Sequence, residues 1–275
     1  MPETIRRHWE VEDLDFAGVD RAVFGDDWLA FKVVATASFI EAGSDLYAGN
    51  LREFFAGDDE LGRWLAGAWE PEELRHGAAL RGYVERLWPA FDWPSRFRDF
   101  LADYGRTCTV PELEATQALE LAARCIVEMG TSALYRALHG YAREPVLKRL
   151  AALIYADEVR HYKMFLRHFR RYQRGEARSR ARVGRTLVKR LLATRSEDGR
   201  CAYRHIWDFA PAQGDSFDAS YRAFSRDVTL LLRSHAPAEM MTRMILKPLS
   251  LPSPIVATAT RLSAPLYGLW FASGH

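Results

Sequence analysis

The sequence predicts an all-α fold in which four long helices form a bundle and further helices follow at the C-terminal end. Apolar residues recur at helical spacing along most of the 275 residues, whereas the alternating pattern of half-buried strands is nearly absent. Four stretches of about 25 to 30 residues are joined by one long and two short connections, which is typical of a four-helix bundle.

The first two long helices are expected over residues 28–55 and 58–87. Asp58 and Asp59 are both suited to cap the second helix, because a carboxylate accepts hydrogen bonds from the free N–H groups at a helix start. Pro71 lies inside the second helix and is expected to kink or split it, because proline has no N–H to donate.

The second pair of helices follows a connector at 88–109, which is rich in aromatic residues and is expected to contain one short helix. The third long helix is expected over 110–140, with Pro111 in its first turn, where the missing N–H has no helical partner to lose. The fourth is expected over 144–175.

The remaining residues are expected to extend the bundle without forming a separate domain. They comprise a basic helix over about 176–194, a loop over 196–215, a helix over 217–234 and an apolar tail interrupted by prolines. The expected organisation is therefore one domain with three parts: an N-terminal extension (1–27), the bundle (28–175) and a helical extension packed on it (176–275).

The composition is that of a globular protein, with 48% hydrophobic and 27% charged residues, which excludes disordered and collagen-like classes. Three cysteines stand far apart without a Cys-x-x-Cys pair, so a zinc ribbon, a rubredoxin-like iron site and a disulfide framework are not expected. Cys125 lies in an apolar helical stretch and is expected to be a buried, inert thiol.

Neither a signal peptide nor a membrane span is indicated, and a cytoplasmic location is expected.

Two short segments carry nearly the same motif. Residues 72–76 read Glu-Glu-Leu-Arg-His, and residues 157–161 read Asp-Glu-Val-Arg-His. The Glu-x-x-His spacing in each segment places a carboxylate and an imidazole on the same face of a helix.

A single glutamate stands at a similar distance before each motif. Glu41 lies 32 residues before Glu73, and Glu128 lies 30 residues before Glu158. Both interrupt apolar helix faces, where an unpaired carboxylate would be costly to bury. Antiparallel packing of the four helices would bring together four carboxylates and two imidazoles, those of Glu41, Glu73, His76, Glu128, Glu158 and His161.

This set of side chains suits a pair of metal ions. Carboxylate oxygens are hard ligands that can bridge two ions, imidazole nitrogens suit iron, and six side chains leave coordination positions open for O2. Zinc fits less well, because it usually takes a smaller tetrahedral set. A lone Glu-x-x-His is usually a surface feature, but two matched motifs with two matched glutamates predict metal binding.

These motifs resemble the ferritin-like di-iron oxidases, and among them most closely the soluble acyl-carrier-protein (acyl-ACP) desaturases. Residues 68–77 (Ala-Trp-Glu-Pro-Glu-Glu-Leu-Arg-His-Gly) are similar to that family's A-W-x-x-E-E-N-R-H-G, and residues 156–161 are similar to its A-D-E-K-R-H. Glu41 followed by Tyr47 is similar to its first-helix pattern. The resemblance covers about residues 28–172.

The sequence departs from the family pattern at two places in the first motif and over its C-terminal part. Leu74 stands where the family has asparagine, and Pro71 comes just before the motif. Residues 200–275 match nothing in the family, so the resemblance leaves the substrate open.

The resemblance implies a role for each residue around the motifs. It makes the six Glu and His side chains named above the ligands of two iron ions. Asp157 and Glu72 would each accept a hydrogen bond from the second ring nitrogen of a ligand histidine. Arg75 and Arg160 would offset these buried acids. Thr131 would place a hydroxyl near the O2 side, although a hydrogen bond to its own helix explains this threonine nearly as well.

The resemblance implies an O2-dependent non-haem di-iron oxidase that desaturates or hydroxylates a carrier-linked acyl chain. The cofactor would be two Fe ions, or one Fe and one Mn, with O2 as co-substrate, a ferredoxin-type electron donor and a homodimeric assembly. Two other functions stay open: a di-iron oxygenase of a non-acyl substrate (an N-oxygenase or tailoring hydroxylase), and a ferritin-like protein for iron storage or peroxide handling.

The net charge of +2 hides an uneven distribution along the chain. Residues 160–200 contain 14 Lys and Arg against 3 Asp and Glu, whereas residues 1–60 contain 5 against 14. A basic block of this kind is a solvated face, a surface for an acidic partner or, as a third possibility, a surface for RNA or an anionic membrane. Arg170, Arg174 and Arg178 are the residues expected to dock an acyl carrier protein. The pattern of aromatic residues in this block does not support a nucleic-acid platform.

Overall fold

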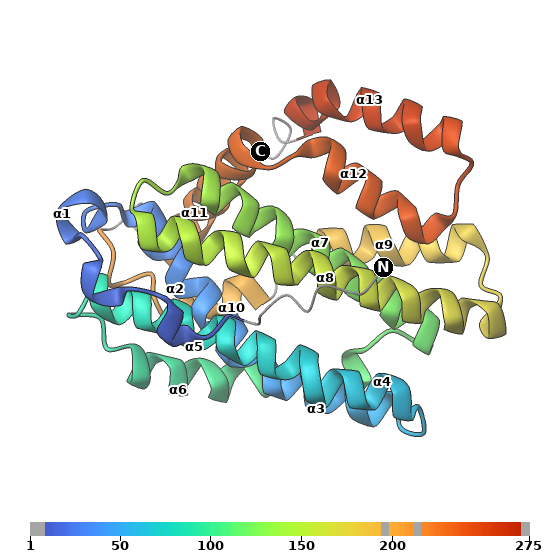
Figure 1. Cartoon of the computed structure of the whole chain (residues 1–275), viewed down its shortest axis with the longest axis horizontal. Helices are drawn as coiled ribbons and strands as arrows, with labels where there is room; N and C mark the ends of the chain where they lie inside the picture. Colours follow the sequence, from blue (N-terminus) through green and yellow to red (C-terminus); the bar gives the residue numbers. More distant parts are fainter. Residues whose placement is uncertain (1–8, 194–197, 212–215, 271–275) are drawn as a thin grey trace.

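The computed structural model describes residues 9–193, 198–211 and 216–270, and every regular element in this part of the chain is a helix. The all-α prediction is therefore confirmed for these residues. Figure 1 shows an elongated body whose longest helices run along its long axis. Four helices carry the candidate site: α2 (Trp28–Ala42), α5 (Glu70–Leu87), α7 (Gln117–Tyr141) and α8 (Pro145–Glu176).

Helices α2 and α5 form the first antiparallel pair. Phe31, near the start of α2, packs edge-on against Trp88, just after the end of α5, with ring centroids 5.1 Å apart. Gly77, in the first half of α5, lies against Ala42 at the end of α2, so closely that a Cβ on Gly77 would lie 2.5 Å from the Ala42 Cα. The two backbones therefore lie in close contact beside Glu41.

The single helix expected over 28–55 is wrong, because the structure interrupts it at Gly43. Helix α2 ends at Ala42 and α3 (Ser44–Phe54) begins directly after Gly43, which has φ −98° and ψ 9°. Glycine weakens a helix interior, and the space it leaves is used by α6 (Trp93–Tyr104). A Cβ on Gly43 would lie 3.2 Å from the Phe100 ring of that helix.

Pro71 changes the type of helix before it and does not end the helix. Helix α4 (Asp59–Trp64) continues through a π-helical turn (Leu65–Trp69) directly into α5, with Pro71 in the first turn of α5. Because proline cannot donate a hydrogen bond to the preceding turn, the wider π turn fits the chain there. Asp58 caps α4 by accepting a hydrogen bond from Leu61 N at 3.1 Å.

Helix α7 begins later than the sequence indicates. A short 3-10 turn (Val110–Glu112) stands where the third helix was expected to start, and α7 begins at Gln117 behind Thr116, whose hydroxyl accepts from Leu119 N. The proline therefore starts a turn and not the long helix, because a side-chain cap is available at Thr116. The connector does contain the expected short helix, α6.

Helices α7 and α8 form the second antiparallel pair. Glu144 caps α8 with hydrogen bonds from Val146 N at 3.1 Å and Leu147 N at 2.7 Å. At the opposite end of the pair, Ala118 N near the start of α7 donates to Glu176 Oε1 at the end of α8, at 2.8 Å. The two helices thus lie against each other over nearly the whole length of α7.

The C-terminal part adds helices to this body, and it is more helical than expected. Helices α9, α11 and α12 contact α7, α10 lies against α2 and α6, and α13 packs on α12 (Figure 1). The expected loop at 196–215 contains α10, and the apolar tail forms α12 and α13; residues 196–197, 212–215 and 271 of those segments lie outside the described residues. The bounds are α9 (Arg180–Ala193), α10 (Asp198–Arg204), α11 (Phe217–His235), α12 (Ala238–Leu246) and α13 (Ser253–Trp270). Within the part of the chain that the structure describes, no helix has the length and apolar character needed to cross a bilayer.

The N-terminal segment packs into the body of the molecule. Its described part contains two 3-10 turns (Val11–Asp13 and Phe16–Gly18) and the short helix α1 (Arg21–Phe24). Trp9 and Phe24 are both buried and belong to a hydrophobic core together with residues of α2 and α5. A second hydrophobic core lies around α3, α4, the π turn and the first half of α7. The buried polar side chains described below lie where these two cores meet.

We expect Gly77→Ala to lower the free energy of unfolding by about 1–3 kcal/mol, the usual cost of overpacking. The added Cβ would lie 2.5 Å from backbone atoms of Ala42, and the higher helix propensity of alanine, about 1 kcal/mol, offsets only part of this cost. Urea denaturation measures the change. Gly62→Ala on α4, where no atom lies within 4 Å, is the control and should stabilise the protein. Equal stabilisation by both substitutions would refute the close approach of α2 and α5.

Candidate metal centre

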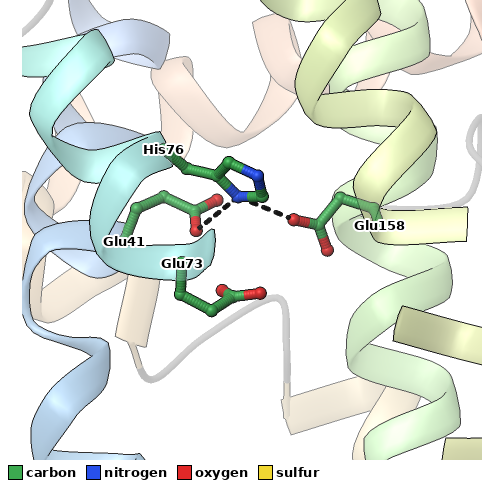
Figure 2. A group of neighbouring side chains, drawn as sticks. All are labelled: Glu41, Glu73, His76 and Glu158. Carbon is green, nitrogen blue, oxygen red and sulfur yellow. Dashed lines mark ion pairs between the residues drawn. The ribbon is translucent and has the colours of Figure 1, made fainter. Parts of the chain in front are cut away.

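The structure brings all six expected ligands together in the centre of the four long helices. Glu41 comes from α2, one Glu-x-x-His pair from α5, Glu128 from α7 and the other pair from α8. All six side chains are buried, with exposed fractions between 0% and 7%. Figure 2 shows the part of the cluster made by Glu41, Glu73, His76 and Glu158.

The six residues form two overlapping groups that could each hold a metal ion. One group consists of Glu41, Glu73, His76 and Glu158, and the other of Glu73, Glu128, Glu158 and His161. In each group the candidate ligand atoms all lie within 4.8 Å of one another. Glu73 and Glu158 belong to both groups, so their carboxylates stand where bridging ligands of a metal pair would stand.

The two ring nitrogens of His76 face different carboxylates, Nδ1 those of the cluster and Nε2 that of Asp157. Its Nδ1 lies 3.2 Å from Glu158 Oε1 and 3.7 Å from Glu41 Oε2, the two contacts drawn in Figure 2. Its Nε2 donates to Asp157 Oδ2 at 3.1 Å. That hydrogen bond leaves Nδ1 as the nitrogen that can take a metal ion.

His161 repeats this arrangement on the other side of the cluster. Its Nδ1 lies 2.9 Å from Glu73 Oε1 and 3.6 Å from Glu128 Oε2, while its Nε2 donates to Glu72 Oε2 at 2.7 Å. Each motif thus supplies the acceptor for the histidine of the other motif, because Glu72 lies on α5 and His161 on α8. The crossed pairing links the α2 and α5 pair of helices to the α7 and α8 pair.

The chemistry of the donor atoms fits a metal pair. Four buried atoms make no hydrogen bond of normal geometry, although groups this deeply buried nearly always make one: Nδ1 of His76, Nδ1 of His161, Oε1 of Glu73 and Oε1 of Glu158. They face one another in pairs, His161 with Glu73 at 2.9 Å and His76 with Glu158 at 3.2 Å, without forming such a bond. Four ionised carboxylates would carry a charge that two divalent cations neutralise. Oxygen and imidazole donors together are suited to iron or manganese.

The pKa shifts of the cluster residues also indicate an excess of negative charge, which bound cations would offset. Burial, together with Glu158 and Glu41, raises the pKa of Glu73 well above its usual range, and burial with Glu128 and Glu41 raises the pKa of Glu158 to about 7. Burial alone would lower the pKa of His76, but the carboxylates around it raise this pKa well above its usual value. His161 has its pKa raised in the same way. The excess of negative charge in the cluster therefore favours the protonated forms of these carboxyl groups and imidazoles.

Two arginines stand behind the acids that hold the histidines. Arg160 approaches Glu72 at 2.7 Å and Asp157 at 2.8 Å, and Arg75 lies 3.8 Å and 3.7 Å from the same two carboxylates. Burial alone would raise the pKa of Asp157, but His76, Arg160 and Trp9 lower it. Both acids thus remain ionised acceptors for the imidazole N–H groups.

Trp9 belongs to this site although nothing in the sequence points to it. Its indole N–H donates to Asp157 Oδ2 at 2.8 Å, and its ring stacks on His76 with an interplanar angle of 3°. The Arg75 guanidinium lies 5.0 Å from the Trp9 ring centre. Because Trp9 is 148 positions from Asp157, only the folded chain could bring the two together.

Arg124 and Tyr135 on α7 were not predicted from the sequence, although their spacing gives a signal. Arg124 forms a buried ion pair with Glu128, four residues later on the same helix face, and this arginine with His161 lowers the pKa of Glu128 to about 2 against the effect of burial. The Tyr135 hydroxyl donates to Glu41 Oε1 at 2.5 Å. Tyr135 follows Glu128 by seven residues, which is two helical turns.

Tyr47, which took part in the resemblance, does not reach the carboxylates directly. Its hydroxyl donates to Glu120 Oε1 at 2.5 Å, and the Arg124 guanidinium lies 4.7 Å from its ring centre. Glu120 is completely buried and also accepts from Glu114 N at 2.8 Å. Tyr47 therefore contacts Arg124, which lies beside the cluster, and not the carboxylates of the cluster themselves.

Thr131 has the contacts of both interpretations made from the sequence. Its hydroxyl lies 2.6 Å from Glu158 Oε2, and also 3.3 Å and 3.2 Å from the carbonyl oxygens of Val127 and Glu128. A hydroxyl has one hydrogen to donate, and the carboxylate is the closest and the charged acceptor. The structure thus places this hydroxyl against a carboxylate of the cluster.

The arginines expected to dock a partner lie at the surface and do not belong to the buried cluster. Arg170 and Arg174 are exposed on α8 and line a shallow pocket, and Arg178 pairs with Glu176 at 2.9 Å. Cys125 is fully buried, as expected, and burial raises the pKa of its thiol.

Comparisons with protein-family models, with curated proteins and with solved structures gave no match to this chain. The chemistry of the site therefore rests on the residues themselves.

We expect Asp157→Asn to weaken metal binding by about 10- to 100-fold, the usual effect of losing the acceptor behind a ligand histidine. The amide carries no charge to favour the Nε2–H tautomer of His76, so Nδ1 is no longer reserved for the metal. Titration with Co(II), followed by its visible absorption, measures the affinity. Asp99→Asn, an exposed acid on α6, is the control. Unchanged affinity in Asp157→Asn would contradict the proposed role of this hydrogen bond.

Proposed function

We propose that this chain is an O2-dependent non-haem di-iron oxidase built on a ferritin-like four-helix bundle. The observation that carries the proposal is the pair of overlapping ligand groups that share Glu73 and Glu158. A single-ion site needs no second histidine with its own acceptor, whereas a metal pair needs two equivalent halves and bridging carboxylates. The two Glu-x-x-His motifs and their crossed hydrogen bonds supply both.

The substrate we propose is an acyl chain attached to a carrier protein, which the sequence resemblance favours. Bound iron would supply the oxidising power that O2 provides for breaking unactivated C–H bonds. Desaturation removes two hydrogens from the chain and, with two electrons and two protons from outside, reduces O2 to two waters. A ferredoxin-type protein is the proposed electron donor.

The chain's own residues would hold the ions and control the surroundings of the reaction. Burial of all six ligands below 8% exposure keeps bulk water away from the metal pair and favours charge-neutral, low-dielectric surroundings. Arg124 and Tyr135 hold Glu128 and Glu41 by an ion pair and a hydrogen bond, which fixes these single carboxylates in place. Thr131 holds the shared carboxylate of Glu158.

We expect anaerobic Fe(II) titration to load two ions per chain, and the ligand variants to differ in a defined way. Glu158→Ala should remove both ions, because Glu158 belongs to both groups, whereas Glu41→Ala should leave one, because Glu41 belongs to a single group. Iron analysis after gel filtration measures the ratio. Glu53→Ala, an exposed acid on α3, is the control and should keep the full content. Equal iron content in Glu158→Ala and Glu53→Ala would refute the shared ligand.

We expect Thr131→Val to keep its iron but to slow O2 consumption by up to about tenfold, the rate equivalent of one lost hydrogen bond of about 0.5–1.5 kcal/mol. Valine has nearly the shape of threonine and removes only the hydroxyl that bonds Glu158. Stopped-flow measurement of O2 consumption after Fe(II) loading gives the rate. Thr131→Ser retains the hydroxyl and should restore it. A normal rate in Thr131→Val would show that the hydroxyl serves only its own helix.

The substrate proposal is tested by mass spectrometry. The Fe(II)-loaded protein is mixed with O2, a ferredoxin system and acyl carrier proteins of several chain lengths. Loss of two hydrogens shows desaturation, and gain of one oxygen shows hydroxylation. If iron loads and O2 is consumed but no acyl chain changes mass, the acyl substrate is wrong and a non-acyl oxygenase is favoured. A cage-sized assembly in size-exclusion chromatography would instead favour iron storage over the proposed oxidase.

A further inference from the structure

A pocket lined by arginines lies on the C-terminal half of α8, outside the metal cluster. Its volume is about 300 Å³, at the lower end of the range of small-molecule sites, about 300–1,000 Å³. Its lining residues are Glu60, Arg167, His168, Arg170, Arg171 and Arg174. The four arginines recur at positions i, i+3, i+4 and i+7 of α8, which places them on one face of the helix.

The charges of this pocket are only partly balanced. Glu60 is engaged by Arg167 at 2.8 Å and by Arg171 at 3.0 Å, and Arg171 also pairs with Asp58. Arg170 and Arg174 are exposed, and among the described residues they form no ion pair. With four guanidinium groups and one carboxylate in its lining, the pocket carries a net positive charge.

His168 gives the pocket a second and independent feature. The residue is 1% exposed, and its Nδ1 lies 3.1 Å from Arg171 Nη2. Because arginine can only donate, Nδ1 must accept, and the ring hydrogen must therefore be on Nε2. Nε2 is buried and has no hydrogen-bond partner. A buried N–H without an acceptor is rare, and here it belongs to a residue that lines a cationic pocket.

The pocket is separated from the metal cluster by one aromatic side chain. Trp64 stacks on His168 with ring centroids 5.9 Å apart, and it meets the ring of His161 edge-on at 6.5 Å. His161 and His168 are seven residues apart, on the same face of α8. A ligand in the pocket would therefore lie beside the wall of the candidate metal centre.

We propose that this pocket binds a phosphate group, with Arg170, Arg174 and His168 as its free donors. A phosphate carries about two negative charges and several acceptor oxygens, and guanidinium groups match these oxygens in pairs. A phosphate has an acceptor oxygen for each of the three donor side chains and about twice the charge of a carboxylate, which has only two oxygens. The proposal does not depend on iron or on turnover, so it can fail while the proposed function holds, and the reverse.

The test is isothermal titration calorimetry of the full-length chain with three probes: inorganic phosphate, 4′-phosphopantetheine and pantetheine without phosphate. We expect saturable binding of the first two and none of the third. Tighter binding of phosphopantetheine than of phosphate identifies a carrier prosthetic group as the source, and equal binding identifies free phosphate. Absence of saturable binding by both phosphate probes overturns the proposal.

Variants locate the binding in this pocket. Arg170→Ala combined with Arg174→Ala should weaken phosphate binding by at least about tenfold, since it removes both exposed guanidinium donors of the pocket. Arg182→Ala with Arg185→Ala, two exposed arginines of α9 that do not line the pocket, is the matched control. Unchanged affinity in the Arg170 and Arg174 variant would overturn the proposal.

The role of the buried histidine is tested separately. His168→Phe keeps a ring to stack on Trp64 but removes the free N–H, and it should also weaken phosphate binding. His168→Gln retains an N–H donor at a similar distance along the side chain and should bind more tightly than His168→Phe. Equal affinity of wild type and His168→Phe would remove His168 from the site. Circular dichroism of each variant confirms that its helices are intact.

Discussion

The burial of four carboxylates and two imidazoles at the meeting point of four helices is the constraint on which this structure depends. Such groups are stable inside a protein only if cations or hydrogen bonds compensate them. Residues outside the two motifs contribute to that compensation, among them Arg124 on α7 and Trp9 in the N-terminal segment. The helices are thus held in register by polar contacts at their centre as well as by the two hydrophobic cores on either side.

The acids and arginines around the histidines explain why the two motifs contain more than Glu-x-x-His. Glu72 and Asp157 hold the histidines of the opposite motif, and Arg160, which forms ion pairs with both acids, helps to keep them charged. Each histidine is thereby left with one free nitrogen toward the cluster. We expect a change in any of these outer residues to alter the histidine that it holds, because burial prevents water from replacing the lost contact.

The meeting of these six side chains could be predicted from the sequence because helix geometry makes spacing informative. Residues three or four apart share a helix face, so spacing alone is enough to pair Glu73 with His76 and Glu158 with His161. The same rule could have found Arg124 four residues before Glu128. Helix ends were less predictable: Gly43 interrupts one expected helix and Thr116 starts another, because neighbouring helices and side-chain caps decide where a helix stops.

What the sequence alone determined is the helical class and the identity of the six side chains that meet, because both follow from periodicity along one chain. Only the tertiary structure decided the remainder. The crossed hydrogen bonds, the place of Trp9 against His76 and the free N–H of His168 in an arginine-lined pocket all join residues distant in sequence or depend on packing. Contacts between elements depend on how the helices bury their faces against one another. The spacing of residues within one helix cannot predict this.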